Sequence, residues 1–179
     1  MNSFQQSQEQ RYPPDPTAPI APFLDAILKT LDTPSTLPIP QLHSQPRIIV
    51  HGNPISPTDF QNLWRNLPLT QHQLTSYDAH LLPGPNGSVS QGHFVIMAHL
   101  KVRFDESGKN RSGDSGDIMG NNNVNTTNIS SHRANWSHWF GVVLNCIVDA
   151  SVVEGWERQC ISSWDYRFTE RPDSSVYGI

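Results

Sequence analysis

The chain has eight histidines among 179 residues, and two pairs of side chains have the types and spacing for chemistry. Asp78 and His80 share one face of a predicted strand, where a carboxylate and an imidazole lining a cavity would form an acid/base pair, as in a dehydratase or isomerase. His93 and His99 also share a face, but about 20 Å of extended chain separates them, too far to bind one metal ion. No third residue presents itself to orient His80. We therefore predict incidental roles for these histidines, no metal and no cofactor, and keep the cavity enzyme as the alternative function.

Other signs of catalysis are lacking in the sequence. It contains no phosphate-binding glycine loop and no nucleophile elbow. Cys146 and Cys160 lie alone on predicted strands, which indicates small core residues rather than a disulfide or a catalytic thiol. The net charge of −4 argues against nucleic-acid binding through the overall field, although a local basic patch stays possible. With neither a signal-peptide pattern nor an apolar run of the ~20 residues that span a bilayer, we expect a soluble, non-secreted protein.

The elements that must position any site begin with residues 93–108, HFVIMAHLKVRFDESG, which have the longest uninterrupted two-residue period. This pattern predicts a long central strand that ends in a turn. Its first face is a core face, formed by Phe94, Ile96, Ala98, Leu100, Val102 and Phe104. Its second face is apolar at Val95 and Met97 and then basic at Lys101 and Arg103, and residues 138–149 are likewise apolar on both faces.

A monomer would expose the second face of both strands as an association liability, so we predict an obligate protein partner there. A similar sheet is the simplest cover, and a homodimer is the rival model. The predicted interface consists of Val95, Met97, His99, Trp139, Val143, Asn145 and Ile147.

The remaining segments predict two helices and further strands. Apolar residues recur at helical spacing from Ile20 to Leu31, and a second helix begins after Ser56, with Pro57 in its first turn. Strands are predicted at 47–51, 70–82 and 161–169, and residues 33–46 are predicted to be an extended connection with little regular structure. Helices early and strands late predict an α+β fold, an antiparallel sheet covered on one face by helices. The predicted core includes Phe23, Ile27, Leu31, Phe60, Trp64, Phe94, Ile96, Leu100 and Phe104.

Composition divides the chain into a tail at 1–17, rich in Gln, Ser and Pro, and a single domain at 18–179 with a polar insert at about 107–135. We expect the tail and the insert to be poorly ordered. The simpler interpretation of the insert is a solvated loop, and the alternative is an adaptable contact surface. Lys109, Arg111 and Arg133 are its cations.

Four segments carry a family resemblance, in the same order along the chain: residues 47–49 (RII), 77–84 (YDAHLLPG), 101–108 (KVRFDESG) and 170–174 (ERPDS). From about Ala18 to Ile179 the chain resembles the fungal mRNA transport regulators, the small subunits of the nuclear mRNA export receptor. The resemblance implies a nuclear transport factor 2-like fold, a strongly bent antiparallel sheet with helices packed in its concave face.

The resemblance also implies a function. We expect a non-catalytic subunit, in the nucleus and at the nuclear pore and shuttling to the cytoplasm, that pairs with the large subunit of the mRNA export receptor. The pair would bind Phe-Gly nucleoporins and carry mRNA and large ribosomal subunits. Glu106, Lys109, Arg111 and Arg133 would then form a cargo-contacting loop that binds the large ribosomal subunit or its RNA weakly.

Overall fold

The computed structural model describes residues 15–33, 39–107, 111, 135–153, 155–156 and 159–169. Residues 1–14, most of the insert and residues 170–179 lie outside this part of the chain. The expectation that the tail and the insert are poorly ordered therefore stays a prediction.

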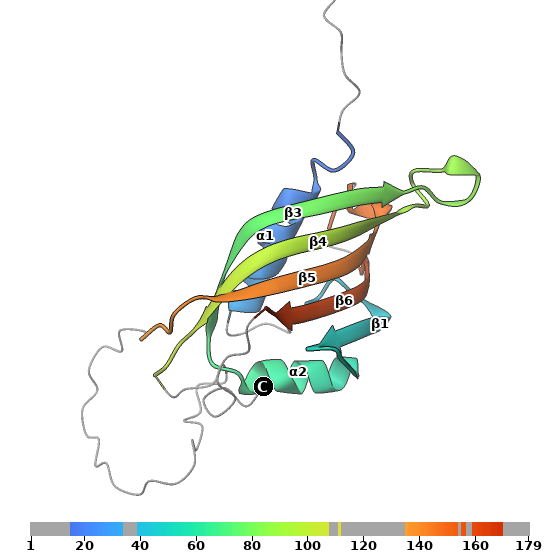
Figure 1. The fold of residues 1–179 in the computed structure, drawn as a ribbon. Coiled ribbons are helices and arrows are strands. Elements are labelled where there is room, and N and C mark those ends of the chain that lie inside the picture. Colours follow the sequence, from blue (N-terminus) through green and yellow to red (C-terminus); the bar gives the residue numbers. More distant parts are fainter. Residues whose placement is uncertain are drawn as a thin grey trace, which may run out of the picture.

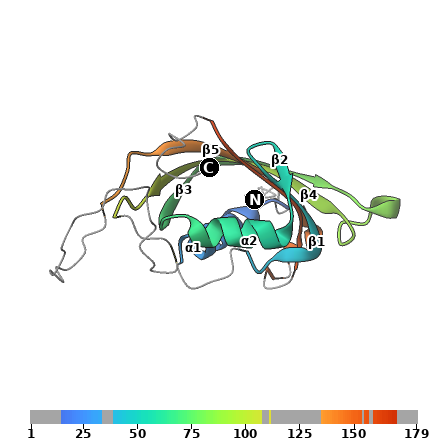
Figure 2. The ribbon, with the colours of Figure 1, turned by 90° about the horizontal axis from the view of Figure 1, so that it is seen from below.

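The described residues form one sheet and two α-helices (Figure 1). The helices are α1 (Ile20–Asp32) and α2 (Pro57–Asn66). The strands, in chain order, are β1 (Leu42–Val50), β2 (Asn53–Ile55), β3 (Thr70–Leu82), β4 (His93–Phe104), β5 (Phe140–Asp149) and β6 (Ile161–Phe168). Their order across the sheet is β2-β1-β6-β5-β4-β3. Figure 2 shows that the sheet is bent and that both helices lie on its concave side, so the α+β prediction is confirmed.

The prediction for β1 and its neighbours was wrong in three respects. The strand begins at Leu42 and not at Arg47; β2 follows it as an unpredicted short strand; and β1 pairs with β6 in parallel, so the sheet is mixed. Pro46 lacks the N–H that a regular ladder needs, but it lies within an irregularity of the β1/β6 register between Leu42 and Arg47. A proline placed there does not end the strand.

The two helices form and pack as their sequences predict. In α1, the predicted apolar stripe is buried, at Ile20, Phe23, Leu24, Ile27, Leu28 and Leu31. In α2, the Ser56 hydroxyl accepts a hydrogen bond from the Asp59 amide at 3.0 Å, and Pro57 occupies the first turn. Phe60 and Trp64 are the buried residues of α2.

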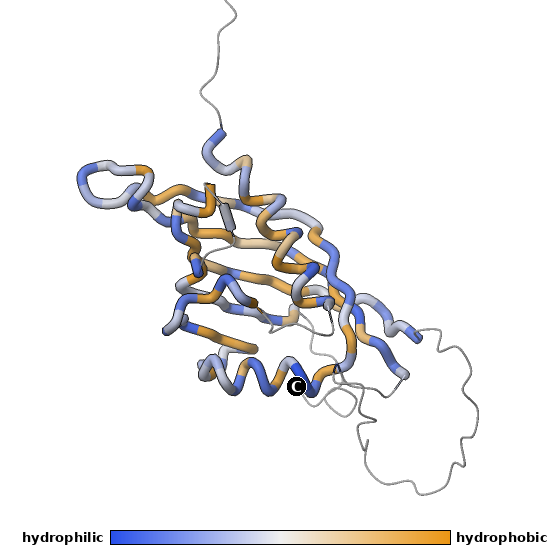
Figure 3. Tube along the Cα trace, turned by 180° about the vertical axis from the view of Figure 1, so that it is seen from behind, coloured by the Kyte–Doolittle hydropathy of each residue, from blue (hydrophilic) through white to orange (hydrophobic). Residues whose placement is uncertain are grey.

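The long hairpin of β3 and β4 pairs from Thr70 with Phe104 to Leu82 with His93, which confirms the predicted antiparallel pair. Its turn extends to Gly92, and a Cβ on Gly84 would lie 2.3 Å from the Gln91 carbonyl oxygen, so this position requires glycine. The inner face of β4 is buried throughout. All nine predicted core residues are buried, and Figure 3 shows apolar residues concentrated along α1 and the strands.

Cys146 and Cys160 are both buried and free, as predicted. Burial is the main cause that raises the pKa of Cys146 to about 12 and that of Cys160 to about 11. Neither thiol has the thiolate character of a nucleophile at neutral pH. No helix in the described ranges is long and apolar enough to cross a membrane.

Candidate functional site

The outer face of the sheet, opposite the helices, presents an exposed apolar patch where β4 and β5 lie side by side. We define the apolar patch as Val95, Met97, Val143 and Ile147. Val95 pairs with Ile147 across the two strands, and His99 pairs with Val143. The exposed fractions are 39% for Val95, 41% for Met97 and 37% for Ile147, large for apolar side chains in mid-strand.

The other predicted interface residues surround this patch. Asn145 pairs with Met97, His99 is exposed on β4, and Trp139 is 38% exposed just before β5 begins. The structure thus brings all the predicted interface residues onto one continuous surface. Their role in binding a partner stays a prediction.

Two carboxylates on the outer face, those of Asp149 and Asp165, form ion pairs or hydrogen bonds with other side chains of the same chain. Asp149 lies 3.0 Å from His43 Nε2 and 3.2 Å from His93 Nδ1, and Asp165 accepts a charged hydrogen bond from Arg167 at 2.7 Å. The hydrogen bonds from Arg167 to Asp165 raise the pKa of this guanidinium. Exposed pairs of this kind add little stability, so their main effect is to leave few free carboxylates on this face.

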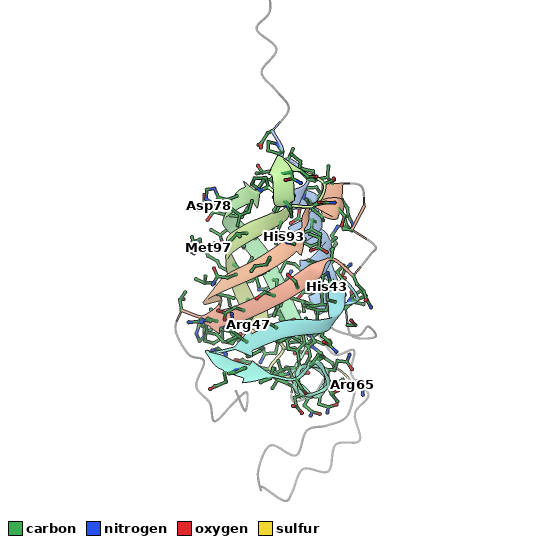
Figure 4. The ribbon with its side chains drawn as sticks, turned by 90° about the vertical axis from the view of Figure 1, so that its right-hand side faces the viewer. His43, Arg47, Arg65, Asp78, His93 and Met97 are labelled. Carbon is green, nitrogen blue, oxygen red and sulfur yellow. The ribbon has the colours of Figure 1, made fainter. Side chains whose placement is uncertain are left out.

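Asp78 and His80 do not line a cavity, which corrects the placement behind the enzyme alternative. Both are exposed, and they pair with Met97 and Val95 on the outer face. Figure 4 shows Asp78 and Met97 on the same side of the sheet. His93 and His99 are separated along β4, and no group of residues in the described part of the chain is suited to hold a metal ion.

The concave side instead contains a buried polar network that the sequence did not reveal. Asp32, at the end of α1, lies 2.5 Å from His72 Nδ1 and accepts a hydrogen bond from the His72 amide at 2.8 Å. His72 Nε2 lies 3.0 Å from the Tyr166 hydroxyl, and Thr70 donates to Asp32 at 2.9 Å. Burial, together with the charge of Asp32, raises the pKa of Tyr166 well above its usual range, so the phenol stays protonated. Local sequence patterns do not reveal this contact, because His72 and Tyr166 are 94 residues apart in sequence.

Arg111 completes this network, which corrects its assignment to the cargo-contacting loop. Its guanidinium is buried, donates to the Leu31 carbonyl and the Thr70 hydroxyl, and stacks 4.9 Å from the Trp64 ring centroid. Burial lowers the pKa of Arg111 to about 10, while Asp32 opposes that shift, so the group remains a cation at neutral pH. A cation suits the carbonyl end of α1, because the helix dipole is negative there. Arg111 is thus not available to phosphates.

An Asp–His–Tyr arrangement resembles an acid/base relay, but its central His72 side chain is fully enclosed. The enclosed space among Phe60, Trp64, Phe104 and Tyr166 measures about 10 Å³, about enough for one water molecule. A more open hollow of about 380 Å³ lies between α1 and β3, but the His72 side chain beside it has no exposed surface. The network therefore holds α1, β3, β6 and Arg111 together.

A bent six-stranded sheet with two helices in its filled concave side, and an apolar face outside, defines a nuclear transport factor 2-like domain. Residues 6–179 match the family model described as "Nuclear pore RNA shuttling protein Mtr2", and the chain belongs to this family. The resemblance seen in the sequence is thereby confirmed.

Relatives with known structures or names support the same assignment. The mRNA transport regulator MTR2 of Candida albicans is 41% identical over 189 residues, covering 92% of this chain and 98% of the relative. Its namesake from Saccharomyces cerevisiae is 30% identical over 171 residues, covering 89% and 90%. Among solved structures, the Candida albicans complex of Mtr2 with the Mex67 M domain matches with a TM-score of 0.72 and 36% identity, covering 89% of this chain and 99% of the matched one.

Replacing Arg111 with Ala is expected to lower the free energy of unfolding by about 3 kcal/mol, because it leaves Asp32 and the Leu31 carbonyl without a buried cation. Arg65→Ala, on the exposed side of α2, is the control and should change stability by less than about 0.5 kcal/mol. Urea unfolding measures both. Equal stability of the two variants would show that Arg111 does not anchor the network.

Proposed function

We propose that the chain is the non-catalytic small subunit of a nuclear export receptor and that the outer face of β4 and β5 binds the large receptor subunit. The observation that carries this proposal is the exposed apolar patch in mid-sheet. The solved complex of the relative with the Mex67 M domain supports it, because that relative shares the fold at 36% identity. The enzyme alternative has lost its support, since Asp78 and His80 are outside and the enclosed space is about 10 Å³.

Covering the patch with a second sheet favours association for a simple reason. Burying apolar surface yields about 25 cal/mol per Å², and neither α1 nor α2 covers the patch. Two sheets packed face to face interdigitate side chains of this size. A homodimer would meet the same requirement, and a mass measurement on the coexpressed chains distinguishes it from the heterodimer.

Phe-Gly nucleoporins, mRNA and the large ribosomal subunit are the further partners in this proposal, and the nucleus and nuclear pore are the proposed location, with shuttling to the cytoplasm. The family description, a nuclear pore RNA shuttling protein, supports this assignment. A Phe side chain from a repeat does not fit an enclosed space of about 10 Å³. We therefore place repeat binding on the surface of the heterodimer.

Because Arg111 is buried, the proposed cargo-contacting loop now consists of Glu106, Lys109 and Arg133. Glu106 is exposed where the insert leaves β4, and its amide donates to the Asn135 carbonyl at 2.6 Å, which holds the two ends of the insert together. Lys109 and Arg133 lie outside the described residues. Two cations are few for tight RNA binding, so the contact would be weak, sensitive to salt and strengthened by sites on the partner.

Met97→Asp and Ile147→Asp are each expected to abolish pairing with the large subunit, because each buries a carboxylate in the centre of the apolar contact. Val153→Asp is the control, since Val153 is 52% exposed but lies in the turn after β5. Coexpression followed by size-exclusion chromatography with mass detection reads out the complex. Survival of the heterodimer in both patch variants would refute the proposed interface.

Deleting residues 112–132 together with the replacements Lys109→Gln and Arg133→Gln is expected to impair export of large ribosomal subunits while mRNA export stays closer to normal. This deletion retains Arg111, whose loss would destabilise the domain and confuse the result. Fluorescent reporters for the large ribosomal subunit and for polyadenylated RNA measure the two exports, with heterodimer formation checked in parallel. If the deletion variant is stable, forms the heterodimer and still exports large ribosomal subunits normally, the proposed cargo contact is wrong. The insert would then be interpreted as a solvated loop.

A further inference from the structure

We propose that Arg103 is a preorganised carboxylate-binding residue and that it receives an Asp or Glu side chain of the large subunit at the edge of the apolar patch. This inference rests on the proposed function, because the carboxylate belongs to the protein that covers the patch. It adds a directional, charged contact to a surface otherwise described by its apolar area.

Arg103 lies over two aromatic rings at the end of β4. Its guanidinium carbon lies 5.1 Å from the Trp136 ring centroid and 4.7 Å from that of Trp139. Trp136 follows the insert and forms an isolated bridge with Asp105, and Trp139 leads into β5. Two tryptophans that follow the insert thus contact an arginine that precedes it.

A third contact restricts the rotation of the Arg103 guanidinium. Gln71, directly opposite on β3, accepts hydrogen bonds through Oε1 from Arg103 Nε at 2.8 Å and from Nη2 at 2.5 Å. No residue in the described part of the chain accepts from Nη1. The end of the guanidinium formed by Nη1 and Nη2 is therefore the edge left for an outside acceptor, and it matches a carboxylate in a bidentate arrangement.

Such an arginine binds at a lower entropic cost than a free one. An exposed arginine loses rotamer freedom worth about 2 kcal/mol on immobilisation, and here two rings and Gln71 have already restricted it. Stacking also leaves the charge intact, so the gain from a new ion pair is retained. Trp and Arg are the residues most enriched in binding hot spots.

The distribution of charge on the outer face favours an acidic protein partner. Lys101 lies two residues before Arg103 on the same face and has no ion-pair partner among the described residues. Elsewhere on this face Asp149 and Asp165 are paired within the chain, and Asp78 lies beside Met97. The end of β4 thus carries unneutralised positive charge beside the apolar patch, although the whole chain has a net charge of −4.

An RNA phosphate is the competing acceptor, and the geometry favours it less. Single-stranded RNA sites offer open aromatic faces for bases, but Arg103 already covers one face of each indole and Trp136 is half-buried. Trp139 directly precedes β5, and Val143 of the apolar patch lies on the same face further along that strand. The two tryptophans are therefore close in sequence to the apolar patch. A protein that covers the apolar patch would therefore also contact Arg103, whereas an RNA phosphate would need a binding site of its own.

The test compares variants of the full chain in titration calorimetry with the purified large subunit. Arg103→Gln, which removes the charge, and Arg103→Lys, which keeps it but lacks the fork, are both expected to weaken pairing by about tenfold or more. Gln71→Glu is expected to weaken pairing without loss of thermal stability, because the new carboxylate neutralises the charge of Arg103 from inside the chain. The control Arg47→Gln, on exposed β1 (Figure 4), should change affinity by less than about fivefold.

The outcomes separate this inference from the function on which it rests. Wild-type affinity in the Arg103 and Gln71 variants, with Met97→Asp still abolishing pairing, overturns the role of Arg103 and leaves the interface standing. If Met97→Asp also pairs normally, the proposed interface itself fails. Each heterodimer is also titrated with a single-stranded RNA oligonucleotide. Weaker RNA binding by Arg103→Gln, with unchanged pairing, assigns the site to RNA and overturns the proposal.

Discussion

The structure depends on one constraint: β4 and β5 are apolar on both faces, whereas the helices cover only one. The concave face closes over the stripe of α1 and over Phe60 and Trp64 of α2, which bury the inner side chains of both strands. The outer side chains receive no such cover, so Val95, Met97 and Ile147 remain in contact with solvent in the isolated chain. Packing against a second protein surface would remove them from water.

A polar network occupies the concave side, whereas the apolar patch lies on the outer face. Asp32, His72 and Tyr166 contact one another there, beside an enclosed space of about 10 Å³. Burying Asp32 and Arg111 separately would be costly, and together they offset much of that cost through Thr70 and the end of α1. Arg111 is thereby buried against the core, although the composition of the insert around it is that of a solvated loop.

Local periodicity was sufficient to predict α1, α2 and the two faces of β4, because each of these depends on residues within a few positions of one another. The parallel pairing of β1 with β6 was not predictable in this way, since it joins residues more than 110 positions apart: Ile48 with Trp164. The burial of Arg111 was missed for the same reason, because its acceptors belong to α1 and β3. The stacking of Arg103 likewise requires residues on either side of the insert.

The central claim is that a partner covers the outer face, and oxidative footprinting of the Met97 side chain tests it most directly. Met97 is 41% exposed in the single chain, so hydroxyl radicals should convert it readily to the sulfoxide. In the purified heterodimer with the large subunit, mass spectrometry of the peptide that contains Met97 should show oxidation reduced by about tenfold, because accessibility controls the rate. Equal oxidation of Met97 in the free chain and in the heterodimer would contradict the account, since the partner would then bind elsewhere.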